Sequence, residues 1–262
     1  MARLSRFVAV LPLVVGMAAC EMSIGNLAGR ATDAWTHTYP LAPGGEIEIG
    51  NTNGRIEVEG VDGSTVEVHA ERIARAATDA GAKELLPRIS IREEATPDHV
   101  TIETQRISGF MIGASFEVRY HVRAPKSAFV HVTNTNGVVA VSGLSGKLYA
   151  HTTNGGVTAT AVSGAVDAQS TNGSVSVTLA SLTDRVALKT TNGGVTLVVP
   201  DDAKADLSAS CTNGGINVSG VKLEATESSR RHVEGTLNGG GVKIDLRTTN
   251  GGIRVRSSRG AG

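Results

Sequence analysis

Six chemically varied residues stand at fixed distances before an Asn-Gly dipeptide that recurs along the chain. Three lie five residues before the dipeptide in successive repeats, and three lie three residues before it. They are His131, Tyr149 and Asp167 in the first set, and His151, Gln169 and Lys189 in the second. Two imidazoles and a carboxylate could hold a metal ion, and an exposed tyrosine could bind a sugar ring. The alternative is a solvated face, and we expect no metal and no cofactor.

The asparagine of the dipeptide is itself a candidate for ligand binding. It occurs at Asn53, Asn136, Asn154, Asn172, Asn192, Asn213 and Asn250. Stacked asparagines could bind calcium or sugar, but the turns lack the carboxylates that a hard cation needs. A calcium-binding Gly-Gly-x-Gly-x-Asp repeat is also absent. We therefore expect a structural ladder in which the side-chain amides bond to one another.

Catalytic chemistry finds little support in the sequence. Cys211 lies two residues before Asn213, where other repeats carry a small polar residue. We therefore expect Cys211 to replace that small residue in an inward column. A reactive thiol needs access and a lowered pKa. Ser-His-Asp catalysis needs a histidine that is oriented by a buried acid, and no spacing here imposes that arrangement. No outward column places acids on neighbouring repeats, as glycoside hydrolysis would require. We expect no catalytic residues and no enzyme.

Four apolar columns flank each dipeptide and indicate the elements that carry these residues. The positions six and four before the asparagine, and three and five after it, are apolar in all seven repeats. The column three residues after it consists of Ile56, Val139, Val157, Val175, Val195, Ile216 and Ile253. Apolar and mostly polar positions alternate, which is the period of a strand with one buried face.

The spacing of the middle asparagines, 18, 18, 20 and 21 residues, is typical of solenoid coils. The sequence therefore predicts an all-β domain over 44–257, built as a single-stranded β-solenoid (β-helix). Stacking like residues on like residues would fill a narrow interior. An antiparallel β-meander or sandwich is the alternative, because Asn-Gly between alternating strands is also a strong hairpin signal.

The regular coils are expected over 127–257, with an irregular N-terminal part over 44–126. In that part, 73–86 predicts a short helix that ends at Pro87. Two further segments, 90–105 and 115–123, predict strands. Within the regular part, 219–240 is out of register and is expected to form a loop or irregular coil.

The first residues resemble an export signal. Two arginines precede an apolar stretch over 7–19, too short to span a bilayer, that ends in Met-Ala-Ala-Cys. This ending resembles the bacterial lipobox, with Met in place of the usual Leu. We expect a signal peptide over 1–19, lipidation of Cys20 and a lipid-anchored tether over 20–43. An ordinary signal peptide with an incidental cysteine is the alternative.

Glu21 follows the cysteine, where aspartate is the usual inner-membrane retention signal. This favours the outer membrane of a Gram-negative bacterium. Lysine plus arginine and aspartate plus glutamate each total 25, so the formal net charge is zero. Nucleic-acid binding depends on clustered excess positive charge, so we expect no nucleic-acid partner. Aromatics at 3% and 32 glycines suit thin, repetitive β-structure with tight turns.

Three stretches resemble the bacterial putative-adhesin family of β-strand-repeat domains, whose biochemical role is unknown. They are Gly44-Gly45-Glu46-Ile47-Glu48-Ile49, the Thr/Ser/Asn-Asn-Gly units, and the ending from Leu237-Asn238-Gly239 to Thr248-Thr249-Asn250-Gly251. The resemblance covers about 41–257 and implies no catalytic residues. We expect a non-enzymatic cell-envelope lipoprotein whose solenoid serves binding, adhesion or scaffolding toward an envelope protein or glycan. A β-helical carbohydrate-active enzyme and a polymerising structural subunit are the alternatives.

Overall fold

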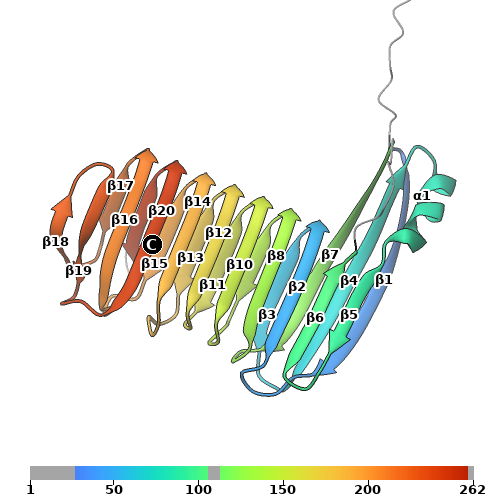
Figure 1. Cartoon of the computed structure of the whole chain (residues 1–262), viewed down its shortest axis with the longest axis horizontal. Coiled ribbons are helices and arrows are strands. Elements are labelled where there is room, and N and C mark those ends of the chain that lie inside the picture. The colour runs from blue at the N-terminus through green and yellow to red at the C-terminus, as the bar shows by residue number, and fades with distance from the viewer. Residues whose placement is uncertain (1–26, 106–112, 259–262) are drawn as a thin grey trace, which may run out of the picture.

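The computed structural model describes residues 27–105 and 113–258 of the chain. Within this part, strands form two sheets that face each other along the length of the molecule (Figure 1). The ten-stranded sheet has the order β1 (Gly29–Pro40), β4 (Thr65–Ala76), β7 (Ala114–Pro125), β3 (Ile56–Val61), β9 (Val139–Ser142), β11 (Val157–Val162), β13 (Val175–Leu179), β15 (Val195–Val199), β21 (Ile253–Ser257) and β17 (Ile216–Ser219).

The eleven-stranded sheet lies opposite. Its order is β18 (Leu223–Ser228), β19 (His232–Leu237), β16 (Ala205–Asn213), β20 (Val242–Asn250), β14 (Val186–Asn192), β12 (Val166–Asn172), β10 (Leu148–Asn154), β8 (Phe129–Asn136), β2 (Glu46–Asn53), β6 (His99–Thr104) and β5 (Ile91–Ala95).

Each regular coil consists of one strand from each sheet, joined by the Asn-Gly turn. Strands of successive coils pair in parallel and in register, so that Asn154 lies opposite both Asn136 and Asn172. The strands of the ten-stranded sheet follow the same rule, with Val175 opposite both Val157 and Val195. This pairing confirms the β-solenoid, because a meander would make neighbouring strands antiparallel.

The four predicted apolar columns form the interior between the sheets. Val157, Val175 and Val195 are at most 1% exposed. Ile216 and Val218, in the outermost coil, are only partly buried because no further coil covers them. The alternation read from the sequence therefore identifies the inward face correctly along the stack.

The coils do not stack in chain order at the C-terminal end. The coil β20–β21 pairs with β14–β15 on one side and with β16–β17 on the other. The last coil of the sequence is thus inserted between two earlier ones, as the red ribbon between orange ones shows in Figure 1. The identical column pattern of the two coils permits either to occupy the inner place.

The prediction of a tether over 20–43 is wrong for residues 29–40, because the chain there forms the edge strand β1, which pairs with β4. The alternation of this strand is hidden in the sequence because polar residues occupy some of its inward positions. Asp33 is one of them, and it accepts hydrogen bonds from the guanidinium of Arg72 at 2.6 and 2.8 Å. The predicted segments 1–19 and 20–26 lie outside the described residues.

Two further expectations need correction. Residues 219–240 form no simple loop, because most of them build the antiparallel hairpin β18–β19, which extends the eleven-stranded sheet. The helix predicted over 73–86 is α1 (Asp79–Leu85), which begins after the capping residue Thr78. Residues 73–76 belong to β4 instead, since strand pairing with β1 and β7 on both sides outweighs local helix propensity.

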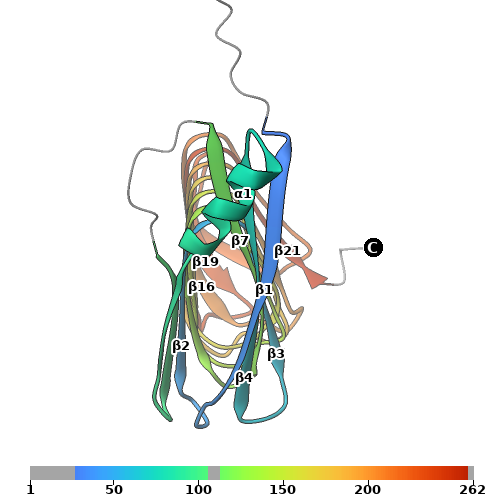
Figure 2. The ribbon, with the colours of Figure 1, turned by 90° about the vertical axis from the view of Figure 1, so that its right-hand side faces the viewer.

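The N-terminal end of the stack is covered by α1, which crosses it in Figure 2. Ala82 and Leu85 are the buried residues of this helix. In the described part of the chain, no helix combines the length and hydrophobicity needed to cross a bilayer.

Candidate functional site

The six predicted patch residues meet on the outward face of the eleven-stranded sheet. Tyr149 lies opposite His131 on one side and Asp167 on the other. In the next outward row, Gln169 lies between His151 and Lys189. The parallel register therefore assembles the outward patch as predicted, on β8, β10, β12 and β14.

Aromatic rings form one half of this face. The rings of His131 and Tyr149 meet edge to face, with centroids 4.5 Å apart and an interplanar angle of 81°. Phe129 lies nearly parallel to His131 at 6.2 Å, and the ammonium of Lys147 lies 4.5 Å from the Phe129 ring centroid. We name Phe129, His131 and Tyr149 the aromatic cluster; all three are partly exposed.

The sequence prediction missed Phe129 and Lys147. Each stands two residues before a patch residue, Phe129 at the start of β8 and Lys147 directly before β10, so alternation places both on the same outward face. The signal was therefore present in the sequence. The two residues stand seven residues before the asparagine, outside the columns five and three residues before it.

The polar half of the patch is partly engaged in contacts of its own. The amide nitrogen of Gln169 donates to a carboxylate oxygen of Asp167 at 2.9 Å. His131 lies 3.9 Å from the carboxylate of Glu46 on β2. Among the described residues, no three histidine, cysteine, aspartate or glutamate side chains gather as they would to hold a metal ion. The arrangement thus offers hydrogen-bonding groups beside rings.

The asparagines form a continuous ladder along one edge of the stack. In six of the seven asparagines, all but Asn53, the side-chain nitrogen donates to the side-chain oxygen of the neighbouring asparagine at 2.7 to 2.9 Å. Its spatial order is Asn53, Asn136, Asn154, Asn172, Asn192, Asn250 and Asn213, which follows the inserted coil. The amides satisfy one another, which is the structural role expected for them.

A second column of hydrogen bonds lies just inside this ladder. In four coils, a buried hydroxyl two residues before the asparagine donates to a glycine carbonyl of the neighbouring turn at 2.7 to 3.0 Å. These donors are Thr152, Ser170, Thr190 and Thr248. Cys211 holds the same position in the outermost coil, and it is a free thiol only 7% exposed. Its burial fits the predicted role of a small-residue substitute.

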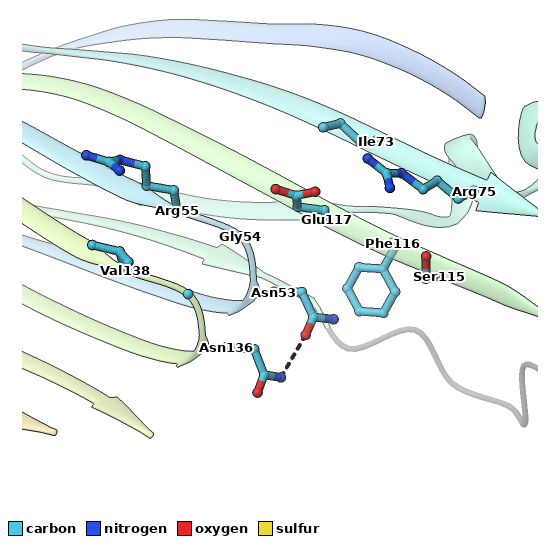
Figure 3. A pocket seen from close by; sticks show the side chains of 11 residues that line it. Asn53, Gly54, Arg55, Ile73, Arg75, Ser115, Phe116, Glu117, Asn136 and Val138 are labelled. Carbon is cyan, nitrogen blue, oxygen red and sulfur yellow. Dashed lines mark hydrogen bonds between the residues drawn. The ribbon is translucent and has the colours of Figure 1, made fainter. Parts of the chain in front are cut away.

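A groove of about 590 Å³ opens at the first rung of the ladder (Figure 3). Its lining comes from β2, β4, β7, the end of β8 and the turns that follow β2 and β8. It includes Asn53, Arg55, Arg75, Phe116, Glu117 and Val138. No sequence pattern pointed to this site, because its walls come from segments far apart in the chain and only Asn53 and Asn136 belong to a predicted column.

Two tyrosines have shifted acidities with structural causes. Burial raises the pKa of Tyr120, whose hydroxyl is hydrogen-bonded to Thr104 at 2.7 Å. Burial also raises the pKa of Tyr39, as does its hydrogen bond to the carboxylate of Glu93. Glu93 lies on β5 and Tyr39 on β1, so this contact joins the two sheets at their N-terminal edges. Both phenols remain protonated at neutral pH and serve the fold.

These features define a parallel β-solenoid that displays polar and aromatic side chains on flat strand faces. The model of the Toastrack family, DUF4097, matches residues 121–256, more than half of the 262-residue chain. The chain belongs to this family of unknown function. No curated protein matches it.

Solved structures resemble the chain at low identity. A putative cell adhesion protein from Clostridium sporogenes is 13% identical, with a TM-score of 0.43, over 86% of this chain and all of its own. A putative adhesin from Bacteroides fragilis is 11% identical, with a TM-score of 0.36, over 86% of this chain and 97% of its own. A putative lipid binding protein from Parabacteroides distasonis is 10% identical, with a TM-score of 0.25, over 85% and 96%. Similarity at this level carries no argument about function.

Proposed function

We propose that this protein is a non-enzymatic lipoprotein of the bacterial cell envelope whose solenoid presents a binding surface to an envelope glycan or protein. The aromatic cluster is the observation that carries the proposal. Aromatics are only 3% of the chain, yet Phe129 and Tyr149 lie partly exposed beside His131 on one outward face. Rings that the core does not use are typical of surfaces that bind partners.

The neighbouring groups suit a ligand with hydroxyl or amide groups. Asp167 and Gln169 present acceptors and donors next to Tyr149 in the adjacent coil. A sugar ring or a flat peptide segment could stack on the rings and bond to these groups at once. The lipobox-like ending before Cys20 supports attachment to the envelope, where such ligands occur.

Binding of the purified full chain to purified peptidoglycan and to an array of bacterial glycans and envelope proteins tests this proposal. We expect Tyr149→Ala to weaken the strongest interaction about tenfold, since truncating a central tyrosine commonly costs that much. Thr158→Ala, on the exposed face of the opposite sheet, is the matched control and should bind like the parent. Equal binding by both variants, or none by the parent, would exclude the aromatic cluster as the binding surface.

A further inference from the structure

Two histidines lie directly opposite each other on the outward face of the ten-stranded sheet. His69 on β4 pairs with His121 on β7 in the antiparallel register. Both are exposed, while the next residues along their strands, such as Val68 and Val122, are buried, so both imidazoles face solvent. All seven histidines lie in the described part of the chain, and no other two of them are paired in this way.

The outer neighbours of this pair face one nitrogen of each ring. Nδ1 of His69 lies 2.9 Å from the hydroxyl oxygen of Thr36 on β1. Nδ1 of His121 lies 3.6 Å from a carboxylate oxygen of Glu57 on β3. A neutral imidazole whose Nδ1–H faces an oxygen carries its free lone pair on Nε2. Histidines that bind metal ions are commonly oriented in this way, with an oxygen on the far side of the ring.

The separation of the two strands suits one ion between the ring tips. Residues directly opposite in an antiparallel pair have Cβ atoms about 4.5–5.5 Å apart. Two Nε2 atoms that bind one ion at about 2.0–2.1 Å lie roughly 3 Å from each other. Two exposed imidazoles on such Cβ atoms reach this separation by rotation about their side-chain bonds.

Both rings border a groove of about 470 Å³ that spans β1, β4, β7 and β3. The two arginines in its lining have carboxylate partners. Arg55 pairs with Glu57 at 2.5 Å, and Arg119 pairs with Glu117 at 2.6 Å. A cation between the histidines is therefore not opposed by an unpaired guanidinium of this lining, and the groove has room for the water that would complete its coordination.

We propose that His69 and His121 bind a divalent first-row transition-metal ion through their Nε2 atoms, with water in the remaining positions. Imidazole suits zinc, nickel and copper, and copper(II) forms the most stable complexes of the three. Magnesium and calcium prefer oxygen ligands and are excluded. Two protein ligands suffice, which agrees with the absence, among the described residues, of three such side chains around one point. The bound ion joins β4 to β7, on the opposite sheet from the aromatic cluster.

Calorimetric titration of the full chain with copper(II), zinc and magnesium, in a buffer that does not chelate metals, tests the assignment. We expect the tightest copper site to hold one ion per chain, zinc to bind more weakly, and magnesium not to bind. Pulsed electron paramagnetic resonance of the copper complex should show two imidazole nitrogens. Absence of copper binding, equal binding of magnesium, or a spectrum with fewer than two imidazoles would overturn the proposal.

Single variants locate the site. His69→Gln and His121→Gln should each lose at least about tenfold in copper affinity, because one imidazole remains. Their thermal midpoints should stay near that of the parent, since both positions are exposed. His151→Gln, the matched control, removes an outward histidine that lies between Thr133 and Gln169 on the other sheet, and it should bind copper like the parent. Retained affinity in His69→Gln or His121→Gln, or an equal loss in His151→Gln, would overturn the site.

Discussion

At the scale of single residues, small and medium aliphatic side chains fill most of the interior between the regular coils. Val157, Val175 and Val195 stack on one another across three coils and are essentially inaccessible to solvent. Outward neighbours such as Thr158 are exposed in the same strands. Two adjacent positions of a strand therefore differ completely in their tolerance of charge.

Val175→Asp should destabilise the protein by about 3–5 kcal/mol, because the carboxylate would be buried without a partner. Thr158→Asp, the matched control, should change the free energy of unfolding by no more than about 0.5 kcal/mol. Thermal unfolding followed by circular dichroism measures both. Similar midpoints for the two variants would show that the column is not an interior one.

The buried hydroxyl column predicts a second effect at this scale. Thr190 is 1% exposed and donates to the carbonyl of Gly173 at 2.7 Å. Thr190→Val keeps the shape but leaves that carbonyl without its donor, and should cost about 1–2 kcal/mol. Thr190→Ser retains the hydroxyl, as Ser170 does in the neighbouring coil, and should cost less than Thr190→Val in urea unfolding. The reverse order would argue against a role for this hydrogen bond.

At the scale of the element, the Asn-Gly turn is set by close packing between coils. A Cβ atom on the glycine of one turn would lie 1.8 to 2.2 Å from the carbonyl oxygen of the glycine in the neighbouring turn, throughout the stack from Gly137 on. The position after the glycine has more room, and it holds Arg55, Val138 and Ser174 in three of the turns. Glycine is therefore required once per turn, for steric reasons.

Gly173→Ala should destabilise the stack by roughly 3 kcal/mol or more, because its Cβ would meet the Gly155 carbonyl oxygen at 2.0 Å. Gly194→Ala is the matched control, since its nearest neighbour is the Gly252 carbonyl oxygen at 3.4 Å. It should change the free energy of unfolding by less than about 1 kcal/mol. Chemical denaturation of both variants gives the comparison, and equal losses would contradict steric control by the turn glycine.

At the scale of the whole molecule, the position of β1 shortens the predicted tether. Strand β1 begins at Gly29, nine residues after Cys20. At about 3.4 Å per residue, a lipid on Cys20 would hold the N-terminal end of the stack within about 30 Å of the membrane. The elongated body would then extend from that end, with both flat faces accessible along its length (Figure 1).

Cys20→Ala should release the protein from the membrane fraction into the soluble fraction, because the lipid would have no attachment point. Cys211→Ala, which removes the buried thiol, is the matched control and should remain with the membranes. Fractionation followed by immunoblotting measures both. A Cys20→Ala variant that still sediments with the membranes would exclude the lipid anchor.

The sequence by itself determined the coil. Strand, turn and inward face recur with each repeat, and the in-register stacking of like residues makes the period of 18 to 21 residues visible without any structure. The outward patch followed directly, since parallel register places equivalent positions of successive repeats side by side. These are local features that recur at a fixed spacing along the chain, so each repeat supports the interpretation of the others.

Only the tertiary structure decided what depends on pairing between distant segments. The coils β16–β17 and β20–β21 carry equivalent apolar columns, so the sequence could not tell which of them packs against β14–β15. Strand β1 became recognisable only beside β4, where Arg72 pairs with Asp33. The groove likewise exists only where β2, β4, β7 and β8 converge on the first rung of the ladder. Contacts between segments far apart in the chain leave no periodic trace in the sequence, because their partners do not recur at a fixed spacing.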